Sequence, residues 1–379
     1  MTTSAGSLGF RAPLDDYRRQ ADELFAALQS GDEPAAWRFK WEHPRFKGKT
    51  LPDVQAATLD LPDAQTVIAR EYSFQTWQDL AAFTTAVSTD RTVARFEEAV
   101  EAVVSGDDAT LRDLLREDPD LVRARSSRHH HCTLLHYLGA NGVESGRQKT
   151  PPNAVEIATL LLAAGAAPDA MADLYDAKCT TMSMLVTSTH PAEAGLQIAL
   201  AETLLDYGAS FIGPGTNWQS AVLSALTFGY PETAEALVRR GAPVDDLPSA
   251  AGLGRIADAS RFLPPADAQS RHVALALAAQ LGRTEIVRLL LDAGEVPNRY
   301  NPNGYHSHAT PLHQAAWNGH SDVVRLLVER RARVDIRDTI YRGTPLDWAV
   351  YGGKDQIADY LRSVGPNTTT EQQSDGGTL

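Results

Sequence analysis

The sequence predicts an all-α solenoid built from repeated helix pairs, with a small helical domain in front of it. Two segments that begin Thr-Pro-Leu start 34 residues apart, at Thr310 and Thr344. Related helix ends, LLAAGA, LLDYGA, LVRRGA and LLDAGE, recur upstream at 161–166, 204–209, 237–242 and 290–295. Apolar residues within these segments follow the spacing of helices. Such self-similarity indicates stacked units that each contact only their neighbours.

The N-terminal module is predicted over residues 15–90. ADELFAALQSGD, DAQTVIAREYSF and TWQDLAAFTTAV each have the spacing of an amphipathic helix. Asp63 and Thr76 are suitable N-cap residues for the last two. Residues 1–14 and the polar tail 367–379 are predicted to be disordered.

About eight repeat units are predicted over residues 92–366, beginning with a degenerate unit at 96–122. In the clearest unit, Thr310 caps the first helix and Pro311 takes its first position, where a missing N–H is harmless. Gly319 ends that helix. The recurring glycines are separated by 43, 33 and 53 residues. We expect the 43-residue gap to contain an insertion within one unit. The 53-residue gap should contain a shortened unit at 247–263.

The segments TPLHQAAWNGH, 310–320, and TPLDWAVYGGK, 344–354, closely resemble ankyrin repeats. The resemblance covers about three-quarters of the chain. With LPDAQTVIAREYSFQTWQDLAAF, 61–83, the whole chain resembles bacterial ankyrin-repeat proteins that carry a helical N-terminal module. The resemblance implies a scaffold for protein partners and a structural role for His136 and His313, because the family's repeats carry a hydrogen-bonding histidine there.

The composition argues against several functions. A net charge of −13 opposes nucleic-acid and acidic-membrane binding. The sequence contains no run of 18 apolar residues, which is the length that could span a bilayer, and its N-terminus lacks the apolar core of a signal peptide. Two cysteines provide no disulfide framework, so we expect a cytoplasmic protein. The GxSxG, GxxxxGK[ST] and HExxH motifs are absent, which makes an enzyme the less favoured class.

The segment RHHHCTLLH, 128–136, has the residue types of a metal site. Alignment with the repeat assigns Thr133 and His136 to a helix and leaves the preceding residues in an exposed finger. Zinc or iron ligands would then be His129, His131, Cys132 and, one repeat later, Cys179. The alternative is a solvated, histidine-rich turn without a cofactor.

An unusually long insertion at 141–161 separates two helices of one repeat. Long loops in compact units are often functional, although a solvated loop is the simpler interpretation. Glu144 could act as a general base and Arg147 as an anion clamp. Tyr175 and His190, in the next repeat, could form the walls of a small-molecule pocket.

A protein partner is expected to lie along the groove formed by the first helices and fingers of the repeats. Aromatic residues in the variable positions suit such a surface, although some could pack as core instead. The predicted binding residues are Tyr137, Asn141, Phe228, Tyr305, His306, His308, Trp317, Asn318, Tyr341 and Tyr351.

The segment AWRFKWEHPRFKGK, 36–49, interleaves aromatic and basic residues. We favour docking of its aromatic residues on the first repeat over binding of nucleic acid. Overall, the sequence favours a non-catalytic, monomeric, cytoplasmic interaction scaffold. The second hypothesis is a small-molecule or metal-dependent enzyme with its site in the two insertions.

Overall fold

The computed structural model describes residues 8–139, 143, 148–174, 177–212 and 220–365. The chain folds as two compact units, which divide between Pro243 and Val244. This division falls inside the predicted repeat region and not at its start. Within the described residues, no helix has both the length and the apolar character needed to cross a membrane.

The first unit begins with a helical module that has its own core. Phe39, Ile68 and Leu80 are completely buried in this core. Phe10 also packs there, so residues 8–13 are packed against the module and not disordered as predicted. The elements are α1 (Leu14–Gln29), α2 (Glu33–Glu42), η1 (Pro44–Phe46), α3 (Leu51–Gln55), α4 (Leu61–Glu71) and α5 (Trp77–Thr89).

Capping boxes fix the starts of α4 and α5. Thr76 caps α5 as predicted, and its hydroxyl accepts a hydrogen bond from the Asp79 amide. The N-cap of α4 is Asp60, not Asp63. Asp63 lies in the first turn, and its carboxylate accepts a hydrogen bond from the Asp60 amide. Two acidic residues three apart satisfy the free amides reciprocally, which explains why either could be mistaken for the cap.

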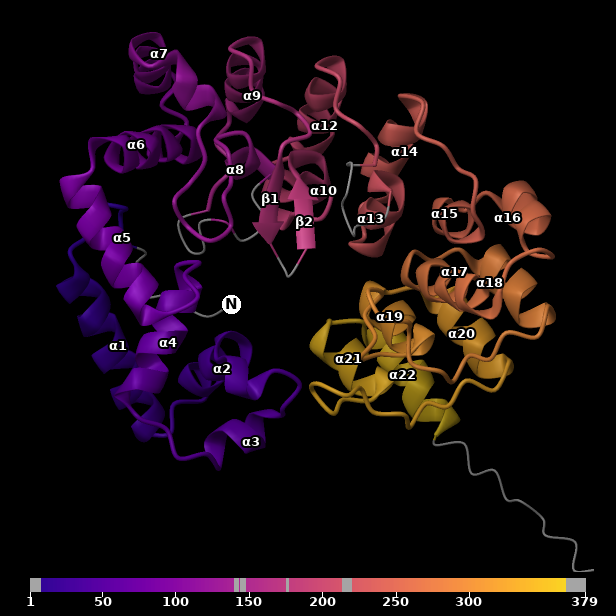
Figure 1. The fold of residues 1–379 in the computed structure, drawn as a ribbon. Helices are drawn as coiled ribbons and strands as arrows, with labels where there is room; N and C mark the ends of the chain where they lie inside the picture. Colours follow the sequence, from indigo (N-terminus) through magenta and orange to yellow (C-terminus); the bar gives the residue numbers. More distant parts are fainter. Residues whose placement is uncertain (1–7, 140–142, 144–147, 175–176, 213–219, 366–379) are drawn as a thin grey trace, which may run out of the picture. The chain divides into compact units, whose positions relative to one another are not determined.

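The repeats of the first unit follow α5 directly (Figure 1). The inner helices α6, α8, α10 and α13 pack in sequence, and the outer helices α9, α12 and α14 form a second row. The bounds are α6 (Arg91–Ser105), α7 (Asp108–Glu117), η2 (Pro119–Arg123), α8 (His136–Gly139), α9 (Ala154–Ala163), α10 (Thr181–Leu185), α11 (Thr189–Glu193), α12 (Gln197–Asp206), α13 (Ala221–Thr227) and α14 (Pro231–Arg239).

Two features of this unit break the regular pattern. The finger before α10 is an antiparallel hairpin of β1 (Met171–Leu174) and β2 (Ala177–Thr180), which pairs Ala172 with Cys179. The insertion predicted from the long glycine gap contains the short helix α11, between α10 and α12. An insertion that forms its own helix leaves the stacking helices undisturbed.

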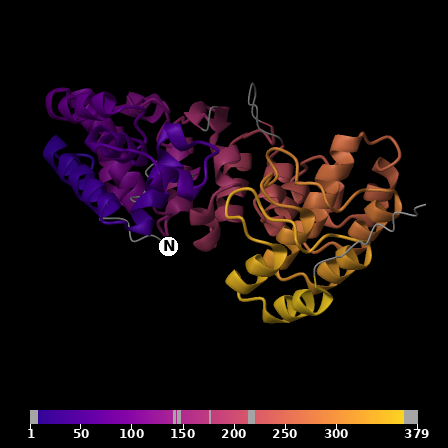
Figure 2. The same cartoon turned by 90° about the horizontal axis from the view of Figure 1, so that it is seen from below.

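The described residues of the second unit, 244–365, form four helix pairs, which follow one another in chain order from orange to yellow in Figure 2. The predicted shortened repeat is α15 with α16, each seven residues long. The bounds are α15 (Leu247–Leu253), α16 (Ile256–Phe262), α17 (Ala268–Gln280), α18 (Thr284–Asp292), α19 (Pro311–Asn318), α20 (Ser321–Glu329), α21 (Pro345–Tyr351) and α22 (Asp355–Val364).

Small side chains set the distance between neighbouring inner helices in the second unit. Ala251, Ala274, Ala315 and Ala349 are completely buried between inner helices, and α15, α17, α19 and α21 pack successively. With the pairs of the first unit, the described residues contain eight helix pairs. The all-α repeat solenoid predicted from the sequence is therefore confirmed.

The caps of α19 have the predicted form. Thr310 is the N-cap, Pro311 opens the helix, and Gly319 ends it with a φ of 84°. The Nδ1 atom of His313 accepts a hydrogen bond from the Thr310 amide at 3.2 Å and lies 2.8 Å from its hydroxyl. His136 and Thr133 have the same two distances in the first unit. These histidines hold the helix starts, as the resemblance implied.

Candidate functional site

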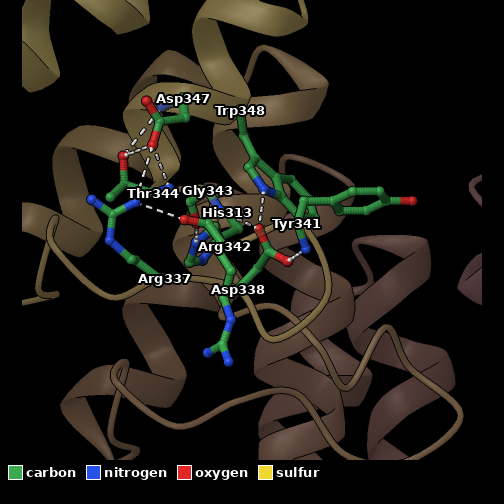
Figure 3. Close-up of polar contacts among 9 residues, drawn as sticks. All are labelled: His313, Arg337, Asp338, Tyr341, Arg342, Gly343, Thr344, Asp347 and Trp348. Atoms are coloured by element: carbon green, nitrogen blue, oxygen red, sulfur yellow. Dashed lines mark hydrogen bonds and ion pairs between the residues drawn. The ribbon is translucent and has the colours of Figure 1, made fainter. Parts of the chain in front are cut away.

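The finger of residues 337–343 is organised around one buried carboxylate, that of Asp338 (Figure 3). Its Oδ1 accepts hydrogen bonds from the amides of Ile340 and Tyr341, at 2.8 and 2.6 Å. Its Oδ2 accepts from the amide of Gly343 at 2.8 Å and from the Trp348 indole at 3.0 Å. One side chain therefore fixes both the turn of the finger and the first helix that follows it.

These hydrogen bonds also keep Asp338 ionised. Burial acts to raise its pKa, but the hydrogen bonds from Tyr341, Trp348, Ile340 and Gly343 outweigh burial, so the pKa lies below its ordinary value. A carboxylate that accepts several N–H bonds is stabilised in its charged form.

Trp348 anchors a group of aromatic rings. Its ring centroid lies 5.2 Å from that of His313 and 5.7 Å from that of His308. Trp317 meets it edge-on at 6.1 Å. His308 in turn contacts Tyr341 at 6.3 Å. The group therefore joins two successive fingers and two successive inner helices, α19 and α21.

The outer members of this group are exposed. Trp317 and Tyr351 stack with centroids 6.0 Å apart and rings inclined by 18°. Their exposed fractions are 41% and 86%. Each lies seven residues after the threonine that caps its helix, so neighbouring repeats present the two rings at equivalent positions. We define the aromatic surface as Tyr300, Trp317, Tyr341, Val350 and Tyr351, each at least 41% exposed.

Hydrogen bonds between fingers fix the edge of the aromatic surface. The Tyr300 hydroxyl donates to the Arg337 carbonyl at 2.6 Å, and the Thr339 amide donates to the His308 carbonyl at 2.9 Å. The Arg337 guanidinium donates to the Arg342 carbonyl at 2.7 Å. The exposed rings are therefore held on a braced framework, as binding surfaces require.

Several predicted binding residues belong to this surface or its border. Trp317, Tyr341 and Tyr351 are members of it. Asn318 is exposed beside Trp317, and its amide donates to the Gln314 carbonyl. His306 and His308 are half-buried, and the latter supports Tyr341. Phe228 is 42% exposed in the first unit, outside the aromatic surface.

Two predicted binding residues are buried, which corrects the prediction. Tyr305 is 5% exposed and packs inside its finger instead of projecting from it. Tyr137 is completely buried beside Phe96 and His130. Tyr137 and the half-buried Trp348 each lie four residues after the threonine at the start of their helix. The exposed rings of Trp317 and Tyr351 each lie seven residues after that threonine. The position within the helix was the signal that could have separated the two classes.

The histidine-rich finger of the first unit is less exposed than predicted. His130 and Cys132 are completely buried, and the His130 ring accepts a hydrogen bond from the Cys132 amide at 3.1 Å. Burial lowers the pKa of His130 well below its ordinary value, and the neighbouring cation Arg128 adds to this. Among residues 129–132, only His129 and His131 are exposed to solvent.

The structure does not bring the four predicted metal ligands together. His131 lies beside Asp173, with 3.2 Å between its Nδ1 and the carboxylate. Cys132 and Cys179 are buried and form no disulfide, and the Cys179 thiol faces the Leu174 carbonyl. In the described part of the chain, no three His, Cys, Asp or Glu side chains are arranged to hold a metal ion.

This finger instead joins the N-terminal module to the repeats. Arg128 pairs with the buried Glu97 of α6 at 2.8 Å. Its guanidinium also lies over the ring of Phe83 at 4.9 Å and that of Phe74 at 5.7 Å. A buried ion pair flanked by aromatic faces therefore links α5, α6 and the finger.

Three of the four residues of the predicted small-molecule site lie outside the described residues: Glu144, Arg147 and Tyr175. The predicted binding residue Asn141 also lies outside them. His190 is half-buried on α11. Within the described part of the insertion, the side-chain amide of Gln148 donates to the Tyr137 carbonyl at 3.2 Å.

The basic and aromatic segment 36–49 packs differently from the prediction. Phe39 enters the core of the N-terminal module. Trp37 and Trp41 stack on each other at 5.9 Å, and Trp41 is 52% exposed. The Lys40 ammonium lies 4.1 Å from the Trp41 ring centroid. Because Phe39 and Phe46 lie in the core of the N-terminal module, the aromatic residues of this segment do not dock on a repeat as a group.

Comparison with known proteins agrees with this architecture. A family model described as ankyrin repeats (3 copies) matches residues 250–339 and 275–372. Ankyrin repeat and SAM domain-containing protein 6 of Mus musculus is 37% identical over 103 residues, which cover 27% of this chain and 11% of that protein. An ankyrin repeat-containing protein of Schizosaccharomyces pombe is 45% identical over 62 residues, which cover 16% of this chain and 28% of that protein.

Cyclin-dependent kinase inhibitor 2A of Homo sapiens is 32% identical over 125 residues, which cover 25% of this chain and 78% of that protein. The chain belongs to the ankyrin-repeat family. The chain spans only 11% and 28% of the lengths of the Mus musculus and Schizosaccharomyces pombe relatives. The likeness to bacterial proteins with a helical N-terminal module stays a prediction.

Proposed function

We propose that the protein is a non-catalytic, cytoplasmic interaction scaffold that binds a segment of a protein partner on the aromatic surface and acts as a monomer. The observation that carries this proposal is the stacked, exposed pair of Trp317 and Tyr351 at equivalent positions of adjacent repeats. Large exposed aromatic rings on a rigid support are characteristic of binding surfaces.

The relatives support a role that depends on a protein partner. One is named for inhibition of cyclin-dependent kinases, which are themselves proteins. Family membership does not specify a partner, because function depends on the site and not on the fold.

The test replaces Trp317 and Tyr351 with alanine together. Partner binding should weaken roughly thirtyfold or more, because central aromatic residues dominate interface energies. Tyr351→Ala alone should change the unfolding free energy by less than about 0.5 kcal/mol, because its ring is 86% exposed. Trp317→Ala should cost more, because its ring also packs on Trp348.

Partners captured from the native host would be compared by quantitative mass spectrometry. Tyr207→Ala is a matched control, since Tyr207 is 41% exposed in the first unit. Proteins retained by the wild type and this control but lost by the double variant support the proposal. Partners retained equally by the double variant would contradict it.

We further propose that binding requires no metal or other cofactor. Elemental analysis of protein purified without a histidine tag should find less than one equivalent of zinc or iron. One equivalent that is lost on Cys132→Ser would contradict this proposal and favour the enzyme hypothesis.

A further inference from the structure

We propose that the segment bound by the aromatic surface is acidic and carries at least one large apolar side chain. This inference rests on the proposed function, because it specifies the chemistry of the partner at that surface. The inference depends on the charged side chains along the edge of the aromatic surface and on whether these side chains are already paired within the protein.

Three arginines line the fingers that border the aromatic surface. Arg299 and Arg342 directly adjoin Tyr300 and Tyr341 in the chain, and Arg337 accepts the hydrogen bond of Tyr300 through its carbonyl. All three are exposed. In a chain with a net charge of −13, three exposed cations beside exposed rings form a local exception.

The nearby carboxylates give Arg337 only a long contact and leave Arg299 and Arg342 without an ion pair among the described residues. Asp338 is buried and accepts four hydrogen bonds from its own finger and Trp348. Asp347 accepts from the amide and hydroxyl of Thr344, and it lies 4.0 Å from Arg337. Across the ranges that the structure describes, no carboxylate forms an ion pair with Arg299 or Arg342.

The ligand chemistry follows from these two sets of groups. Guanidinium groups pair preferentially with carboxylates, often through two parallel hydrogen bonds. The Trp317 and Tyr351 rings offer an apolar platform that binds a large aliphatic or aromatic side chain. A segment that carries Asp or Glu on either side of such a residue satisfies both. A nucleic-acid strand fits less well, because the charge of the whole chain repels its regularly spaced phosphates, whereas a short acidic segment brings only a few charges to the three arginines.

The experiment selects ligands for the full chain from a random displayed peptide library. Enriched peptides should contain more Asp and Glu than Lys and Arg, together with a large apolar residue. Affinity of a selected synthetic peptide is then measured for two double variants. Arg299→Gln with Arg342→Gln should weaken binding about three- to tenfold, as two exposed ion pairs would. The loss should shrink as salt is added.

A matched control removes the same charge elsewhere in the unit. Arg288→Gln with Arg362→Gln changes two exposed arginines on the outer helices α18 and α22. This control should bind the peptide within about twofold of the wild type, because the outer helices carry none of the residues that define the aromatic surface. Equal losses in both double variants would indicate a general charge effect and overturn the inference.

The remaining outcomes separate this inference from the proposed function. Selected peptides without an acidic excess, whose binding still depends on Trp317 and Tyr351, overturn the inference and leave the proposed function intact. Peptide binding that is insensitive to both rings overturns both. Sedimentation showing a dimer that dissociates on Trp317→Ala with Tyr351→Ala would identify a second copy as the occupant and overturn the inference.

Discussion

Replacing Asp338 with asparagine tests whether one buried carboxylate holds the finger beside the aromatic surface. Asparagine has nearly the same shape but only one acceptor oxygen. That oxygen can replace Oδ1, which takes two amides, or Oδ2, which takes the Gly343 amide and the Trp348 indole. The NH₂ group would then face the other two donors, which cannot hydrogen-bond to it.

The expected loss can be worked from these contacts. Two hydrogen bonds to a charged acceptor are removed, each worth about 1.5–3 kcal/mol. The unfolding free energy of the second unit should therefore fall by about 3–6 kcal/mol on that scale. Hydrogen exchange of the Ile340, Tyr341 and Gly343 amides should accelerate, because they lose their acceptor or its charge.

Asp347→Asn provides the comparison. Its carboxylate is 59% exposed and serves the capping box of α21, so the loss should be only about 0.5–1 kcal/mol. Denaturant unfolding followed by tryptophan fluorescence measures both variants. If the Asp338 and Asp347 variants lose the same free energy, or the three amides exchange at the wild-type rate, the central role of Asp338 is refuted.

The same site predicts a pH dependence with a definite sign. Because the folded pKa of Asp338 is depressed, its contribution to stability is complete above the unfolded value of about 3.9 and is lost as pH falls through the folded value. The asparagine variant lacks this contribution and should show a shallower acid limb.

Two further predictions concern buried ionisable side chains. Arg128→Met leaves Glu97 buried without its 2.8 Å partner, so it should destabilise the first unit by about 3–5 kcal/mol in thermal unfolding, whereas the double change Arg128→Met with Glu97→Leu should recover much of that loss. Burial lowers the pKa of His136 and of His313 to about 4, so stability should be flat above about pH 6.5 and fall by about 1.4 kcal/mol per unit for each histidine down to about pH 4. A His313→Gln variant whose unfolding keeps the full wild-type slope would contradict the assignment for that residue.

Local chemistry made much of the repeat architecture predictable. Thr310, Pro311 and Gly319 each act within a few residues of their position, and the structure uses all three as the sequence predicts. The structural role of His136 was implied by the resemblance to ankyrin repeats, in which its offset from Thr133 matches that of His313 from Thr310. Such signals survive in a single sequence because their partners lie nearby in the chain.

The site was less predictable because its contacts join residues from different repeats. Asp338 bonds to Trp348 ten residues later, and Tyr300 reaches the carbonyl of Arg337. Asp338 was not among the predicted site residues, although an acidic residue opening a turn that ends in glycine is a recognisable signal. The strands β1 and β2 were also missed, because each is only four residues long.

The contacts of Arg128 with Glu97 and Phe83 affect how the first unit unfolds. Separating the N-terminal module from the repeats would draw Phe83 away from Arg128 and bring water to Glu97, which is now completely inaccessible. Fraying from that end therefore has a high first barrier, whereas repeat arrays commonly lose their terminal units one at a time. The module and the opening repeats should protect their amides as one cooperative block, and the first unit should resist proteolysis from its N-terminal side.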